Sequence, residues 1–137
     1  MESVDTFTFG LETLVNSGRE PVVIDSVHLV DPSGMSIIEA RIVTFPDGWN
    51  RGATLIGSAP GYPPEEREAW LRSVPAVEAE ISPGGKTGDV FNLVVGLQMD
   101  ADIERATAAG VEVRYTYDRS QRIYHTTNSL ELARDSC

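Results

Sequence analysis

Short stretches in which apolar and polar residues alternate, each bounded by turn-forming residues, run through most of this chain of 137 residues. In residues 6–12, for example, Phe7, Phe9 and Leu11 fall on one side of an extended chain, and Glu12 falls on the other. A period of two is the pattern of a half-buried β-strand, whereas a helix repeats its apolar residues every three or four positions. The alternation therefore predicts an all-β fold.

We expect seven or eight such strands, because the alternating stretches recur between clusters of Gly, Pro, Asn, Asp and Ser. No long helical pattern separates them, which argues against a parallel α/β sheet. The predicted fold is an antiparallel β-sandwich in one domain that spans residues 1–137. Residues 90–97 are the most apolar stretch and are expected at the centre of a sheet, whereas the Ala-rich residues 100–109 suit a helical turn or a loop. The expected strands cover residues 6–12, 21–29, 36–45, 76–81, 90–97, 110–117, 121–126 and 129–133.

Two pairs of neighbouring stretches are separated by residues that favour tight turns. Within residues 14–30, Asn16, Gly18 and Pro21 lie between two apolar runs, which predicts a hairpin. Residues 118–120 predict a second hairpin, and its two flanking strands alternate more regularly than any others in the chain.

In an extended strand, odd-numbered and even-numbered residues face opposite sides. A switch of the apolar residues from one set to the other therefore predicts where the strand is interrupted. Val22 and Ile24 share one face of their strand, but Val27 and Leu29 share the other, so we expect a bulge or bend at residues 25–26. In the third strand, Ile38, Ala40 and Ile42 share one face and are the expected inward-facing residues.

Residues 46–75 form an irregular insertion in this strand pattern, rich in Gly and Pro. Residues 64–73 are expected to form a short helix, because Pro opens the segment and acidic residues fill its first turn. The insertion holds both tryptophans, and Trp, Tyr and Arg predominate at interface hot spots. It is therefore the candidate partner-binding surface, although Trp70 could instead attach the helix to the sandwich. The candidate residues are Trp49, Arg51, Tyr62 and Trp70.

The charge of the chain argues against two classes of partner. With 21 acidic and 11 basic residues, the net charge is −10, and such a surface repels phosphate backbones and anionic lipid. We therefore expect a protein partner rather than nucleic acid. No apolar run is long enough to span a membrane, and no signal peptide is evident at the start, so any anchor would lie outside this chain. Cys137 is the one cysteine, so no intramolecular disulfide can form.

Catalytic motifs are not found in the sequence. Only two histidines are present, and no serine lies in a Gly-x-Ser-x-Gly motif, so we expect neither an enzyme nor a bound cofactor. A copper site is the sharper alternative, because imidazole and thioether groups suit that metal. No His-x-Met or Met-x-x-Met pair occurs, so its ligands would have to converge from separate strands: His28, Met35, Met99 and His125.

Three segments, taken in order, resemble bacterial immunoglobulin-like envelope domains. The first is the Asn-Ser-Gly turn at 16–18 with the strand that follows it, the second is the Ser-Pro-Gly-Gly turn at 82–85, and the third is the strand at 110–117. The resemblance leaves out residues 46–75, and the paired cysteines and intervening tryptophan of antibody domains are missing. It implies an immunoglobulin-like sandwich outside the cytoplasmic membrane, and no functional residue is carried over.

The leading hypothesis is therefore a non-enzymatic, immunoglobulin-like interaction module of the cell envelope, with an unidentified ligand. A copper-handling sandwich is the first alternative. The second is a cytoplasmic acidic inhibitor or immunity-type protein that neutralises a basic partner. An extracytoplasmic location is favoured, and a cytoplasmic one stays open.

Overall fold

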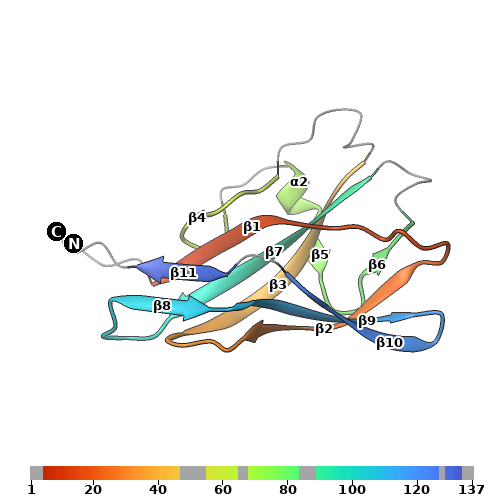
Figure 1. Cartoon of the computed structure of the whole chain (residues 1–137). Helices are drawn as coiled ribbons and strands as arrows, with labels where there is room; N and C mark the ends of the chain where they lie inside the picture. Colours follow the sequence, from red (N-terminus) through yellow and green to blue (C-terminus); the bar gives the residue numbers. More distant parts are fainter. Residues whose placement is uncertain (1–4, 47–54, 65–67, 84–88, 127–128, 134–137) are drawn as a thin grey trace.

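The computed structural model describes residues 5–46, 55–64, 68–83, 89–126 and 129–133, except for the side chain of Leu11. This part of the chain forms antiparallel strands and one short helix, which confirms the predicted all-β sandwich (Figure 1). The strands are β1 (Thr6–Leu14), β2 (Val22–Val30), β3 (Met35–Phe45), β4 (Ala59–Pro60), β5 (Val74–Pro75), β6 (Glu80–Ile81), β7 (Val90–Met99), β8 (Arg105–Ala108), β9 (Gly110–Tyr117), β10 (Ser120–His125) and β11 (Leu130–Ala133). The helix is α2 (Glu68–Leu71).

Two main sheets pack against each other. The five-stranded sheet has the order β4-β1-β7-β3-β5, and the four-stranded sheet has the order β10-β9-β2-β6. A small sheet of β8 and β11 adds its apolar residues to the same core. The Ala-rich segment that was expected to be a helical turn or a loop therefore contains strand β8.

Strand β7 lies at the centre of the five-stranded sheet, as its apolar sequence predicts. One face carries Phe91, Leu93, Val95 and Leu97 into the core between the sheets, where they meet Ile24, Val111 and Val113. On the other face, Val94 packs in a second cluster with residues of β3, α2 and the described part of the insertion. Because both faces are covered, the strand is apolar along most of its length.

The bulge predicted at residues 25–26 is present, because the register of β2 against β9 shifts between Ile24 and Ser26. A second bulge, between Ile37 and Glu39, corrects the expectation for β3. It moves Ile37 to the core side and leaves Ile38 43% exposed, although Ile42 is buried as expected. A smooth alternation in the sequence therefore concealed a change of face.

A third bulge, in β1, has the largest consequence for the site. The register against β7 shifts between Phe9 and Glu12, next to Gly10, and the extra residue reverses the faces that follow. The fully buried side chain of Asn92 supports this bulge: its amide donates to the carbonyls of Gly10 and Glu12, at 3.0 and 2.9 Å. Glu12, which was expected on the solvent face, is buried as a result.

The hairpin predicted over residues 14–30 is wrong, because β1 and β2 belong to different sheets. The connection between them is held by Asn16, whose amide donates to the carbonyls of Glu20 and Ile81 and accepts from the Gly18 N–H. Gly18 is needed for space: a Cβ there would lie 2.5 Å from the Tyr117 hydroxyl oxygen. The turn residues thus direct the chain from one sheet to the other.

The second predicted hairpin, β9–β10, is confirmed. Its two turn residues, Asp118 and Arg119, both have positive φ angles, of 46° and 68°, as a type I′ turn requires. This hairpin and the connection from β1 to β2 lie at the same end of the molecule (Figure 1).

The strand predicted over residues 76–81 is wrong in its extent. Here the chain crosses between the sheets, because Ala76 N–H donates to Ala40 on β3 and Glu78 N–H donates to Ile24 on β2. Only the two-residue strands β5 and β6 form on either side of the crossing. The helix expected at 64–73 is described only as α2, since residues 65–67 lie outside the described part of the chain.

Candidate functional site

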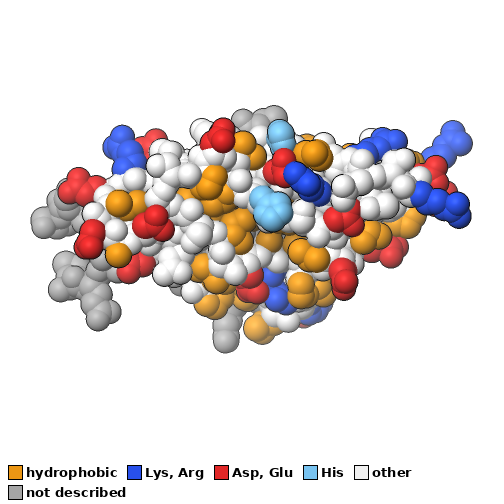
Figure 2. All heavy atoms as spheres, turned by 90° about the horizontal axis from the view of Figure 1, so that it is seen from below, with side chains coloured by type: hydrophobic (Ala, Val, Ile, Leu, Met, Phe, Trp, Pro, Cys, Tyr) orange, Lys and Arg blue, Asp and Glu red, His pale blue; other side chains and the backbone are white. Residues whose placement is uncertain are grey.

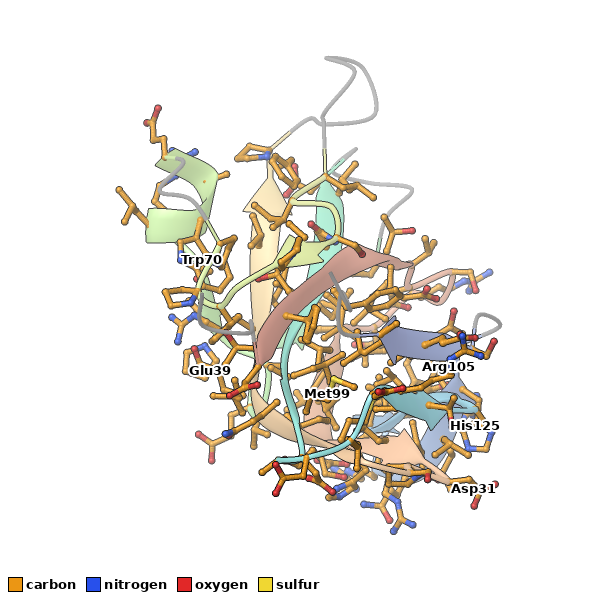
Figure 3. All side chains as sticks on the ribbon, turned by 90° about the vertical axis from the view of Figure 1, so that its left-hand side faces the viewer. Asp31, Glu39, Trp70, Met99, Arg105 and His125 are labelled. Carbon is orange, nitrogen blue, oxygen red and sulfur yellow. The ribbon has the colours of Figure 1, made fainter. Side chains whose placement is uncertain are left out.

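Two of the four residues predicted to bind a partner form the cover of the five-stranded sheet. Trp70 is 9% exposed and packs against Val43 and Val94, and the Tyr62 ring meets it edge-on at 5.9 Å. Figure 3 shows Trp70 on the outer side of this sheet, and Met99 between the two sheets. So deep a burial of Trp70 agrees with the alternative interpretation, in which it attaches the helix to the sandwich. Trp49 and Arg51 lie outside the described residues.

Tyr62 is held in this cover by two contacts. Its ring lies over Gly96, where a Cβ would come within 2.7 Å of the ring, and its hydroxyl donates to Glu39. Burial and the hydrogen bond to Glu39 raise the pKa of Tyr62 well above its usual value. These contacts fix the orientation of the ring toward β7 rather than toward solvent.

The four residues of the copper alternative do not come together. Met35 and Met99 are directly opposite each other on β3 and β7 and are buried in the core. His28 and His125 are exposed on the outer face of the four-stranded sheet, where Figure 2 shows both histidines beside acidic and basic side chains. In the described part of the chain, no three His, Cys, Asp or Glu side chains form a metal-binding cluster. The two methionines and the two histidines of the predicted set lie in separate places, in the core and on the surface.

The two histidines instead flank Glu112, which is directly opposite each of them across neighbouring strands. The Nε2 atom of His125 lies 3.2 Å from one carboxylate oxygen of Glu112, and Arg114 donates to the other at 3.0 Å. These two partners hold the pKa of Glu112 below its usual value. Both contacts are exposed to solvent, so Glu112, Arg114 and His125 form a surface charge network.

A cleft of about 560 Å³ opens between the sheets, at the end where the β9–β10 hairpin lies beside the connection from β1 to β2. Its walls come from the second half of β1, from the residues that follow it, and from β9 and β10. Three of the four tyrosines in the chain line it, together with one arginine and one buried acid. These residues are Tyr115, Tyr117, Tyr124, Arg122 and Glu12.

The carboxylate of Glu12 is the least expected member of this set. Only 8% of the residue is exposed, and the carboxylate accepts a hydrogen bond of 3.0 Å from the Tyr124 hydroxyl across the gap between β1 and β10. Burial and this hydrogen bond raise the pKa of Tyr124. The carboxylate thus lies at the wall of an open cleft with one side-chain partner among the described residues.

The tyrosine rings supply the complementary surface. The Arg122 guanidinium lies 5.2 Å above the centre of the Tyr117 ring, which is the geometry of a cation–π contact. The Tyr117 hydroxyl in turn accepts the N–H of Arg19 and so holds the wall of the cleft in place. One cation of this chain is therefore already stabilised by an aromatic ring at the cleft.

This combination of groups suits the binding of a cation. A carboxylate and aromatic faces together stabilise an ammonium or guanidinium group. Ser17 is the only serine that lines the cleft in the described part of the chain, and no histidine lies there to activate it. The arrangement can hold a basic side chain.

Sequence reasoning assigned these residues to the scaffold. The alternation over residues 110–117 predicts that Tyr115 and Tyr117 share the inward face of a strand, but it does not show that this end of the sandwich is open. Gly10 was the signal for Glu12, because a glycine inside a strand often marks a bulge. A bulge at Gly10 would place Glu12 on the inner face of the strand.

Comparison with known proteins identifies no relative. No family model matches the chain, and neither a curated protein nor a solved structure is similar to it. Within the described residues, no helix is long and apolar enough to cross a membrane.

Proposed function

We propose that this protein is a non-enzymatic interaction module that holds a basic side chain of a partner protein in the cleft between β1 and β10. One observation carries the proposal: the Glu12 carboxylate is 8% exposed and lies at the wall of a tyrosine-lined cleft. A carboxylate removed from water is costly unless a charged or hydrogen-bonding partner accompanies it. The Tyr124 hydroxyl supplies one hydrogen bond, and a lysine or arginine of the partner supplies the opposite charge.

The aromatic lining supports the same class of ligand. A cation above a tyrosine ring gains about 0.5–2 kcal/mol, with the larger value when water is excluded. Tyr124 lies next to the Glu12 carboxylate, so a bound cation would meet a ring and a carboxylate together. The contact of the Arg122 guanidinium with the Tyr117 ring is a cation–π contact of this kind within the chain itself.

The net charge of −10 supports a basic partner at longer range, because it draws a positive surface toward the molecule and speeds association. The resemblance to immunoglobulin-like envelope domains supports an interaction module outside the cytoplasmic membrane. An acidic inhibitor in the cytoplasm would use the same cleft, so the proposed binding chemistry does not depend on the location.

Nuclear magnetic resonance titration tests the proposal. The probe is a short peptide rich in Thr and Val with one central Arg, and the comparison peptide carries Gln at that position. We expect the Arg peptide to shift the signals of Glu12, Tyr115 and Tyr124, and the Glu12→Gln variant to bind it about tenfold more weakly, a loss of about 1.4 kcal/mol.

Glu104→Gln is the matched control, because Glu104 is an exposed acid that does not line the cleft. It removes the same charge and should bind like the unaltered protein. Equal binding of the Arg and Gln peptides, or no shift at these residues, contradicts the proposal.

A further inference from the structure

Within the described residues, strand β10 is a free sheet edge beside the cleft. It is the terminal strand of the four-stranded sheet, and all six of its residues are exposed. The other terminal strands in the described part of the chain are two or four residues long. Among them, β10 therefore offers the longest edge to an incoming chain.

The register shows which backbone groups of β10 are free. The Thr126 N–H donates to Val111, and Thr126 follows β10 directly, so even-numbered residues here point their backbone groups toward β9. Partners alternate along an antiparallel pair, and the N–H and C=O groups of Gln121, Ile123 and His125 therefore point away from the sheet. These are the groups that a further strand would use.

The side chains of the same strand divide between two faces. Arg122 and Tyr124 line the cleft, whereas His125 lies beside Glu112 on the outer face. A strand added along β10 would thus extend the sheet and place every second side chain over the cleft. The free edge and the cleft form one continuous surface.

From this juxtaposition, and resting on the proposed function, we infer that the partner is an extended segment that pairs with β10 as an additional antiparallel strand. Backbone hydrogen bonds to the edge supply affinity, and the cleft selects the side chains, as in other cases of strand addition. All neighbouring strands of the two main sheets pair in antiparallel order, which favours the same direction for the added strand.

The cleft also indicates the sequence of the segment. A residue opposite Tyr124 would project toward Glu12 and should be basic, because the Tyr124 hydroxyl contacts that carboxylate. A residue opposite Arg122 should be acidic, and the one between them, opposite Ile123 on the outer face, should be β-branched. The expected partner motif is therefore Arg or Lys, then Val or Ile, then Glu or Asp. A second copy of this chain is a poorer occupant, since each copy carries a charge of −10.

Hydrogen exchange with a Thr- and Val-rich peptide that contains Arg-Val-Glu tests the inference. We expect the amides of Gln121, Ile123 and His125 to become protected when the peptide binds, whereas those of Arg122 and Tyr124, already paired with β9, change little. Methylation of the Val nitrogen should weaken binding about tenfold or more, because that N–H would donate to Ile123. Methylation of the Arg nitrogen is the matched control and should be tolerated, since that N–H would point away from β10.

The variant Ile123→Pro removes the outward N–H and leaves the pairing with β9 intact, and Ile123→Thr is its control. Peptide binding that shifts Glu12 and Tyr124, but gives no protection and ignores Val methylation, overturns strand addition and leaves the proposed function standing. Failure of the Arg-Val-Glu peptide to bind at all overturns both. Protection of the same amides in a dimer without peptide assigns the edge to a second copy and overturns the inference.

Discussion

Asn92 shows how one side chain can determine the geometry of the site. Its amide group is fully buried in β7, donates to two carbonyls of the β1 bulge, and accepts the N–H of Ile56 at 3.0 Å. The bulge turns Glu12 toward the cleft. Asn92 is distant in sequence from Glu12, yet its amide supports the bulge that determines which way the Glu12 carboxylate points.

We expect Asn92→Leu to lower the free energy of unfolding by about 3 kcal/mol, because the carbonyls of Gly10 and Glu12 and the N–H of Ile56 would each lose a hydrogen bond in a buried or partly buried place. Urea denaturation measures this loss. Gln98→Ala, an exposed change on the same strand, is the control and should cost less than about 0.5 kcal/mol. An equally small effect at Asn92 would contradict the role assigned to its amide.

Tyr124 makes the stability of the fold depend on alkaline pH. Its pKa is raised in the folded protein by burial and by Glu12, so the folded state favours the protonated phenol. The resulting stability is complete below the unfolded pKa near 10 and is lost as the pH rises through the folded pKa. Tyr62 acts in the same direction.

Denaturation at pH 8 and at pH 11 should therefore show a drop in stability, and Tyr124→Phe should reduce that drop. The Tyr62→Phe variant should reduce it as well, since the pKa of Tyr62 is raised by its own burial and by Glu39. If removal of Tyr124 leaves the drop unchanged, the phenol is not held neutral by the fold.

At the scale of elements, helix α2 covers β7 mainly through the buried Trp70. Trp70→Ala should lower the free energy of unfolding by about 3–5 kcal/mol, because it opens the packing on Val43 and Val94. Leu71→Ala in the same helix is the control, since Leu71 is 67% exposed. If the loss for Trp70→Ala is instead in peptide affinity, with stability intact, Trp70 belongs to a partner surface.

Strand identity was largely predictable, because alternation and turn residues are local properties. The β9–β10 hairpin, the central position of β7 and the bulge at residues 25–26 all follow from neighbouring residues alone. The bulges near Gly10 and Ile38 were missed, since Phe7, Phe9 and Leu11, and likewise Ile38, Ala40 and Ile42, alternate as they would in an uninterrupted strand. The hydrogen bonds that stabilise the β1 bulge come from Asn92, which lies on a strand distant in sequence.

At the scale of the whole molecule, the assignment of strands to sheets was not predictable. Residues 14–30 look like a hairpin, but Asn16 and the close contact of Gly18 with Tyr117 carry the chain into the other sheet. Those contacts span the two sheets, so no local pattern contains them. The cleft is a product of this topology, which is why Glu12 and Tyr124 could not be paired from the sequence.

The net charge adds a property of the molecule as a whole. Basic peptides should bind more weakly as the ionic strength rises from about 0.05 M to about 0.5 M, because salt screens long-range attraction. The loss should fall mainly on the association rate, and surface plasmon resonance separates this rate from dissociation. An affinity that does not change with salt would show that the charge of −10 plays no part in binding.

A double-mutant cycle tests the cation site most directly. Calorimetry would compare the unaltered protein and Glu12→Gln, each with the Arg-Val-Glu peptide and with the same peptide carrying neutral citrulline in place of Arg. We predict a coupling free energy of about 1–2 kcal/mol between the carboxylate and the guanidinium. A coupling of zero, with all four affinities additive, would contradict the claim that Glu12 holds a basic side chain of the partner.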